Sequence, residues 1–248
     1  SMTRAMRAFL SRLLAGESRA ADLVNSVYTA GKYLQDGSAS NSGSPHNTER
    51  VLSHVRQYLH GRKGDGPSMS FVNLLETHNP HTVMPQSARA LGIEFEEAEV
   101  DALNLPDDDH EFLFGNDDVR DPFGDWDNLY RKKLDAYRTS VHHLDGLLEE
   151  FVANLDGEYL SNSLVILTGD HGEMFGEEGM VSHQTSLHPA GIQVPLFVKF
   201  PDDWRNNKTT FSSPVNWMGL SETLKRVTTG QISTPKSFQK TLVEASKN

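Results

Sequence analysis

A short apolar run that ends abruptly in polar residues is the feature that most constrains this chain. Residues 164–167 are Leu-Val-Ile-Leu, and Asp170 and His171 follow shortly after, between two glycines. This pattern is typical of a buried strand in a parallel sheet whose carboxyl end delivers polar side chains into a cleft. The alternative is a strand followed by a polar turn in which Asp170 caps the next helix. Both interpretations place a strand here.

The residue types at the end of this strand suit a metal ion. Asp170 offers a hard carboxylate oxygen and His171 offers an imidazole nitrogen, which are both ligands of divalent cations in proteins. Gly169 and Gly172 have no Cβ, so that the backbone can approach whatever lies there. The sequence therefore predicts Asp170 and His171 as metal ligands.

The segments around this strand occur in a distinctive order. A possible strand ending at His78 and a helical pattern at 130–151 precede it. A glycine-containing loop, then His183, a second apolar run at 194–198 and a helical pattern at 214–230 follow it. This order resembles the carboxyl-terminal half of sulfatases and related hydrolases of the alkaline phosphatase superfamily, over roughly residues 68–232.

The resemblance implies a fold, an activity and roles for named residues. It implies an α/β sandwich with a mostly parallel central sheet, incomplete at its N-terminal side, and a sulfuric ester hydrolase that uses one divalent metal. Asp170 and His171 match metal ligands, for which Ca²⁺ is the first expectation and Mn²⁺ or Zn²⁺ the alternatives. His78 matches a histidine beside the leaving-group oxygen, and His183 matches a residue that grips the anion. The implied substrate is a small sulfate or phosphate ester.

Several histidines also have simpler interpretations. His78 and His81 flank a proline, as a pair of loop histidines would, and His183 could lie in a plain surface loop. His142 and His143 fall inside a helical pattern without an acidic partner, and we expect them to be structural.

Two features of the family pattern are missing from this sequence. No acidic pair follows an apolar strand upstream, and no Cys, Ser or Thr nucleophile segment is recognisable. With no cysteine in the chain, a formylglycine nucleophile cannot arise in it. We therefore expect a partial catalytic domain that is inactive alone and that an upstream polypeptide would complete. The alternatives are a phosphodiesterase or phosphonate monoester hydrolase of the same superfamily, and a catalytically silent binding module.

The organisation of the chain follows from its composition. Residues 1–60 contain helical patterns, with a Ser- and Gly-rich stretch at 36–47 that predicts a flexible linker. The basic amphipathic pattern at 2–15 favours a surface helix over a membrane-bound one. Residues 94–127 form an acidic excursion, whose Asp runs lack the ligand spacing and glycine of an EF-hand loop. Residues 68–232 form the metal-site-bearing core of a single domain, 1–248.

Charge and hydrophobicity exclude some classes of protein. The net charge of -11 argues against a general nucleic-acid binder, which needs a basic surface. The apolar runs are far shorter than the roughly 20 residues that a membrane-spanning helix requires. The absence of cysteine excludes disulfides and thiolate metal sites. These exclusions agree with an enzyme that acts on small anionic esters.

Overall fold

The computed structural model describes residues 48–61, 66–78, 81–103, 125–183, 186–204, 210 and 213–247. The expected helix at 2–15, the linker at 36–47 and the Asp runs of the acidic excursion lie outside these residues. The chain divides into two compact units. Ser1–Asn154 and Glu173–Gly191 form the first unit, and Leu155–Gly172 and Ile192–Asn248 form the second.

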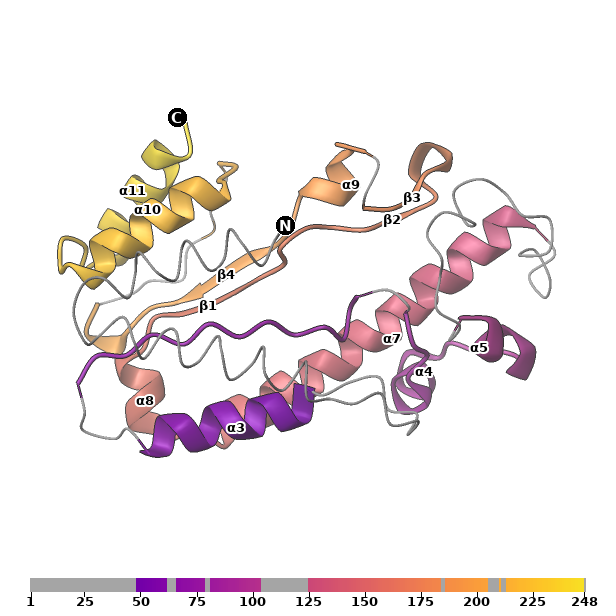
Figure 1. The fold of residues 1–248 in the computed structure, drawn as a ribbon, viewed down its shortest axis with the longest axis horizontal. Helices are drawn as coiled ribbons and strands as arrows, with labels where there is room; N and C mark the ends of the chain where they lie inside the picture. Colours follow the sequence, from indigo (N-terminus) through magenta and orange to yellow (C-terminus); the bar gives the residue numbers. More distant parts are fainter. Residues whose placement is uncertain are drawn as a thin grey trace, which may run out of the picture. The chain divides into compact units, whose positions relative to one another are not determined.

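The first unit is built on one long helix, α7 (Trp126–Ala153). Its N-terminus is capped by Asp125, whose carboxylate accepts a hydrogen bond of 2.8 Å from the Asn128 N–H. Three helices pack on α7, namely α3 (Thr48–Gly61), α4 (Pro85–Leu91) and α5 (Glu97–Leu103). Figure 1 shows α3 alongside the C-terminal half of α7. The helix predicted at 130–151 is thus confirmed, and α3 is a helix within the helical patterns expected over residues 1–60.

Apolar side chains from sequence-distant segments form the core of this unit. The buried members of the core are Val83, Leu103, Leu129, Ala136 and Val181. Leu129 and Ala136 lie seven residues apart on the same face of α7, since two helical turns separate them. Burying this face holds the first unit together.

Glu99 closes the N-terminus of α5 and forms an ion pair that ties α5 to α7. The buried Glu99 carboxylate accepts hydrogen bonds from the Glu96 N–H at 2.9 Å and from Lys132 Nζ at 2.7 Å. Burial opposes ionisation of this carboxyl, but the hydrogen bonds from Lys132 and from the Glu96 backbone outweigh it and lower the pKa of Glu99. The acidic excursion therefore includes an ordered helix that the composition did not predict.

The strand predicted before His78 is not formed. Residues 66–75 are extended but pair with no strand in the described part of the chain, and Phe71 is 59% exposed. The segment is anchored instead at Glu76, which is 1% exposed. Its carboxylate accepts hydrogen bonds from the Thr48 N–H at 3.2 Å and from the Thr48 hydroxyl. The order of segments in the family pattern indicated a strand, but a strand also needs a partner for its backbone.

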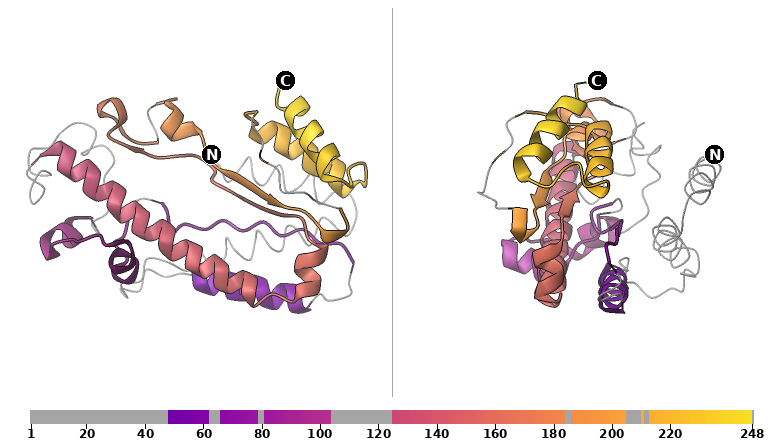
Figure 2. Two further views of the ribbon diagram at one scale, coloured as in Figure 1. Left: turned by 180° about the vertical axis from the view of Figure 1, so that it is seen from behind. Right: turned by 90° about the vertical axis from the view of Figure 1, so that its left-hand side faces the viewer.

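The second unit is a two-stranded sheet covered by helices. Strand β1 (Val165–Thr168) pairs antiparallel with β4 (Leu196–Lys199), with Thr168 opposite Leu196. Helices α10 (Trp217–Thr228) and α11 (Pro235–Ala245) lie side by side in both views of Figure 2. Their buried side chains form a core with one face of the sheet, which includes Ile166 and Val198. The other elements of this unit are α8 (Gly157–Asn162) and the 3₁₀ turn η3 (Asp202–Trp204).

The secondary structure is mixed, as an α/β fold requires, but the expected mostly parallel central sheet is not shown. The described strands form two antiparallel pairs, β1 with β4 and β2 (Met174–Phe175) with β3 (Val181–Ser182). The run at 164–167 does become a strand, and the runs at 194–198 and 214–230 become β4 and α10. The sequence shows the length and the apolar character of a strand, but neither property specifies whether the neighbouring strand runs parallel or antiparallel to it.

None of the helices in the described part of the chain has the length and apolar character that crossing a membrane demands.

Close approach of α10 to α11 depends on Gly219. A Cβ at this position would lie 2.9 Å from the Leu242 carbonyl oxygen and 2.9 Å from the Ser246 nitrogen, both of which are backbone atoms. We expect Gly219→Ala to push the helices apart and to lower the free energy of unfolding by about 1–3 kcal/mol, the usual cost of overpacking. Thermal and urea unfolding followed by circular dichroism would measure this. Gly146→Ala is the matched control, because no atom lies within 4 Å of its Cβ and alanine favours the helix.

Candidate functional site

The end of β1 carries the predicted metal ligands. The strand ends at Thr168, whose hydroxyl donates to the Gly169 carbonyl at 3.1 Å. A Cβ on Gly169 would lie 3.2 Å from Val194 Cγ1 and 3.2 Å from the His171 carbonyl oxygen. A side chain at residue 169 would therefore crowd the turn that presents Asp170 and His171.

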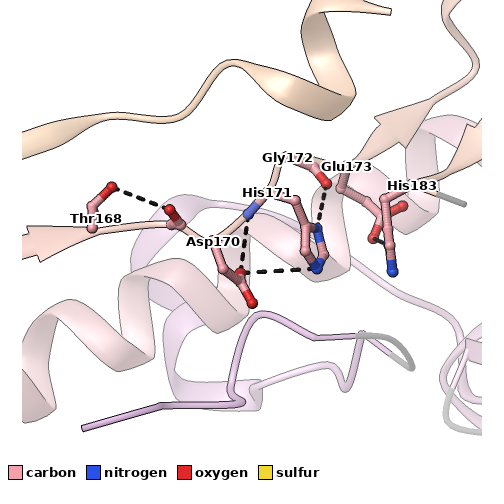
Figure 3. A network of polar contacts seen from close by, with 7 residues as sticks. Thr168, Asp170, His171, Gly172, Glu173 and His183 are labelled. Carbon is pink, nitrogen blue, oxygen red and sulfur yellow. Dashed lines mark hydrogen bonds and ion pairs between the residues drawn. The ribbon is translucent and has the colours of Figure 1, made fainter. Parts of the chain in front are cut away.

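Asp170 and His171 are turned toward each other (Figure 3). The His171 N–H donates to Asp170 Oδ1 at 3.1 Å, and His171 Nε2 lies 3.8 Å from the same oxygen. His171 Nδ1 lies 2.9 Å from the Gly172 carbonyl. Because a carbonyl only accepts, Nδ1 carries the proton, and the lone pair of a neutral His171 is on Nε2, which faces Asp170.

This pair suits part of a metal shell. The Asp170 side chain is 77% exposed and that of His171 is 40% exposed, so a hydrated cation could reach both. No helix starts after Asp170, since the chain continues into β2, and the alternative of a helix cap is wrong. Within the described part of the chain, no three His, Asp or Glu residues lie close enough to hold a metal. The pair alone therefore supplies two ligands.

A tight hairpin in the first unit brings two more polar residues together. Met174 in β2 lies opposite Ser182 in β3, which puts Glu173 and His183 side by side at the open end of the hairpin. The hairpin turns through the 3₁₀ turn η2 (Glu177–Gly179), with φ of 113° at Gly176. Glycine adopts this conformation without strain.

Glu173 and His183 form a largely buried hydrogen-bonded pair (Figure 3). His183 Nδ1 lies 3.0 Å from Glu173 Oε2, and the side chains are 19% and 11% exposed, respectively. Two neighbouring oxygens, Glu173 Oε1 and Ser182 Oγ, are buried and have no hydrogen-bond partner among the described residues. Ser182 also has a φ of 68°, which is unusual for a residue with a Cβ. Unsatisfied polar atoms and strained backbone tend to mark functional sites.

The His183 ring contacts a second imidazole, and three further rings of the same unit pack together. The His78 and His183 rings are in edge contact, with their centroids 6.0 Å apart. His81, which is 5% exposed, packs against Tyr137 and Phe175 at centroid distances of 5.5 Å and 5.2 Å. The structure thus brings together His78 and His183, the histidines assigned to the leaving group and to the anion.

Burial raises the pKa of the Tyr137 phenol, and the negative charge of Glu173 raises it further. Tyr137 therefore keeps its proton at neutral pH and remains a neutral polar group beside the Glu173 carboxylate.

The structure divides the predicted residues between its two units. Asp170 and His171 belong to the second unit, and His78 and His183 belong to the first. His142 Nδ1 lies 3.1 Å from the Ser87 hydroxyl of α4, which agrees with the structural role expected for it.

Sequence reasoning missed Glu173, which contacts His183 across the hairpin. The available signal was an acidic residue directly after Asp-His-Gly, ten positions before a histidine.

The family model and the relatives that match this chain are all sulfatases by name. A family model described as Sulfatase matches residues 16–219. A protein named Uncharacterized sulfatase YidJ, from Escherichia coli (strain K12), is 27% identical over 166 residues, which cover 65% of this chain and 32% of the relative. An Ulvan-active sulfatase from Formosa agariphila is 24% identical over 169 residues, or 67% of this chain and 29% of the relative. The chain spans about a third of the length of these relatives. No solved structure matches it.

The raised pKa of Tyr137 predicts a specific loss of stability in alkali. Folding raises the pKa of the Tyr137 phenol above the ordinary tyrosine value of 10.0. The neutral phenol therefore contributes to the free energy of unfolding below that pH, and this contribution is lost as the pH rises through the folded-state pKa. We expect the unfolding free energy of Tyr137→Phe to fall less steeply above about pH 10 than that of the wild type. Urea unfolding at a series of pH values would measure the slopes. Equal slopes would contradict the prediction, and Tyr159→Phe on α8 is the control.

Proposed function

The chain belongs to the sulfatase family, and we propose that it supplies the metal-binding and anion-binding part of a sulfuric ester hydrolase. The observation that carries the proposal is the Asp170–His171 pair at the end of β1, in a chain that the Sulfatase family model matches over residues 16–219. The relatives are about three times as long as the matched part, so the activity proposed is that of a protein that contains this chain.

Asp170 and His171 would hold one divalent cation. When bound, such a cation would offset the negative charge of the ester group and help to orient the nucleophile. Ca²⁺ is the first expectation from the resemblance, whereas the imidazole of His171 favours Mn²⁺ or Zn²⁺. Further ligands would come from outside the described residues, through the acidic pair that an upstream polypeptide would carry together with the nucleophile.

His78 and His183 would act on the ester itself. With ring centroids 6.0 Å apart, the two imidazoles can both contact one tetrahedral anion and the oxygen that leaves it. We assign His78 to the leaving group, which takes up a proton as its bond to sulfur breaks. We assign His183 to the transferred group, whose negative charge its ring N–H would stabilise.

A phosphodiesterase or phosphonate monoester hydrolase with the same residues is the second candidate. The observation that favours it is the histidine at position 171, because an imidazole ligand suits Mn²⁺ or Zn²⁺ better than Ca²⁺. A silent binding module would share the family fold but would turn over neither kind of ester.

Metal binding by this chain should be weak. Two protein ligands give low affinity, because affinity depends on the number and geometry of the ligands. Calorimetry with Ca²⁺, Mn²⁺ and Zn²⁺ should therefore show weak binding at best, and replacing Asp170 and His171 together by alanine should remove it. The control replaces Asp145 and His143, the same residue types on α7. Tight binding that survives the Asp170 and His171 replacements would refute the assignment.

The roles of His78 and His183 can be separated in a longer protein that joins this chain to an upstream acidic pair and nucleophile. His78→Ala should slow sulfate esters with poor leaving groups by about 10²- to 10⁴-fold and activated aryl sulfates much less, because only poor leaving groups need the proton. His183→Ala should slow all esters similarly.

Rates on a leaving-group series of aryl sulfates and bis-aryl phosphates would decide both questions. Faster turnover of the phosphates would favour the second candidate function. Equal leaving-group sensitivity in the two variants would contradict the division of roles. The chain by itself is expected to hydrolyse neither ester, since no nucleophile is recognisable in it.

A further inference from the structure

Glu173 is held against His183 by the geometry of the hairpin. The pairing of Met174 with Ser182 places residues 173 and 183 next to each other, although ten positions separate them in the chain. The turn that closes the hairpin is fixed by backbone hydrogen bonds from the Gly176 N–H to the Met180 carbonyl at 2.9 Å and from the Gly179 N–H to the Gly176 carbonyl at 2.9 Å. The contact is therefore built into the fold.

The environment of Glu173 is unusual for a carboxylate. Its side chain is 11% exposed, and Oε1 is buried with no hydrogen-bond partner among the described residues. Burying a carboxyl oxygen without a partner is costly, so stability of the fold does not account for this position. Its basic neighbour in the hairpin is His183, whose Nδ1 lies 3.0 Å from Oε2.

The contact determines where the protons of His183 lie. An ionised carboxylate only accepts hydrogen bonds, so Nδ1 of His183 carries a proton directed at Glu173. In the imidazolium form, the second proton is on Nε2, at the other side of the ring. A His183 that is paired through Nδ1 can therefore donate from Nε2 to an anion, and its ring orientation is fixed while it does so.

We propose that Glu173 is a positioning residue that holds His183 by Nδ1 so that its Nε2–H donates to the anionic group of the substrate. The proposal deepens the function proposed above and rests on it for the identity of the anion. Glu173 itself makes no contact with substrate. It acts through His183, as a carboxylate partner orients a histidine in other sites.

The test uses the full chain labelled with ¹⁵N and inorganic sulfate as the probe. Long-range ¹H–¹⁵N correlation spectra report which ring nitrogen of His183 carries a proton, and a sulfate titration followed at the same signals gives the affinity. The wild type should show a proton on Nδ1 of neutral His183. In Glu173→Gln, whose amide can donate as well as accept, the proton should be distributed over both nitrogens. Sulfate affinity should fall about tenfold or more, as expected for loss of a charged hydrogen-bond partner.

Glu178→Gln is the matched control, since it removes the same charge from an exposed position of the same hairpin turn. It should leave both readouts unchanged. The proposal is overturned if Glu173→Gln retains the wild-type proton position and sulfate affinity. It is also overturned, whether or not the variant folds, if neutral His183 of the wild type is protonated on Nε2.

Failure of the proposed function gives a different result. If Glu173 fixes the Nδ1 proton but sulfate shifts no His183 signal, the contact with Glu173 is supported and the anion-binding role of His183 is contradicted.

Discussion

The close approach of Gly176 to the ring of Tyr130 is the constraint on which the contact between His183 and Glu173 depends. A Cβ at residue 176 would lie 2.6 Å from Tyr130 Cδ2, and the φ of 113° at this position favours glycine as well. Only a residue without a side chain lets the hairpin lie this close to α7. The turn then reverses the chain, so that His183 returns to Glu173 rather than continuing away from it.

Buried hydroxyls on α7 provide the second support of the site. Thr139 Oγ1 accepts a hydrogen bond of 3.0 Å from the Met84 N–H, and the Ser140 hydroxyl donates to the Thr82 carbonyl at 3.1 Å. Thr139 and Ser140 are fully buried, and a buried hydroxyl or backbone group without a hydrogen-bond partner would be costly. They fix the segment that follows His81 against the same helix that carries Tyr137. Helix α7 thus contributes side chains to the core of the first unit, carries Tyr137 and holds the segment that follows His81.

Local patterns in the sequence predicted local structure well. The strand that delivers Asp170 and His171 was predicted from its apolar run, the helix over 130–151 was predicted from the family pattern, and both are present. The segment that ends at His78 shows the limit of this reasoning, because a local segment of sequence does not specify the partner that a strand needs. The contact between Glu173 and His183 was missed for a related reason: it depends on the register of a hairpin whose strands are only two residues long.

The two histidines assigned to ligand binding are oriented in the same way but by acceptors of different charge. His171 directs Nδ1 at the neutral carbonyl of Gly172, whereas His183 directs Nδ1 at the carboxylate of Glu173. A neutral acceptor suits a neutral imidazole, whose Nε2 lone pair can bind a cation. A carboxylate suits an imidazolium, whose Nε2–H can bind an anion. The charge of the acceptor at Nδ1 therefore provides a physical basis for the roles proposed for the two histidines, with His171 at the metal and His183 at the ester.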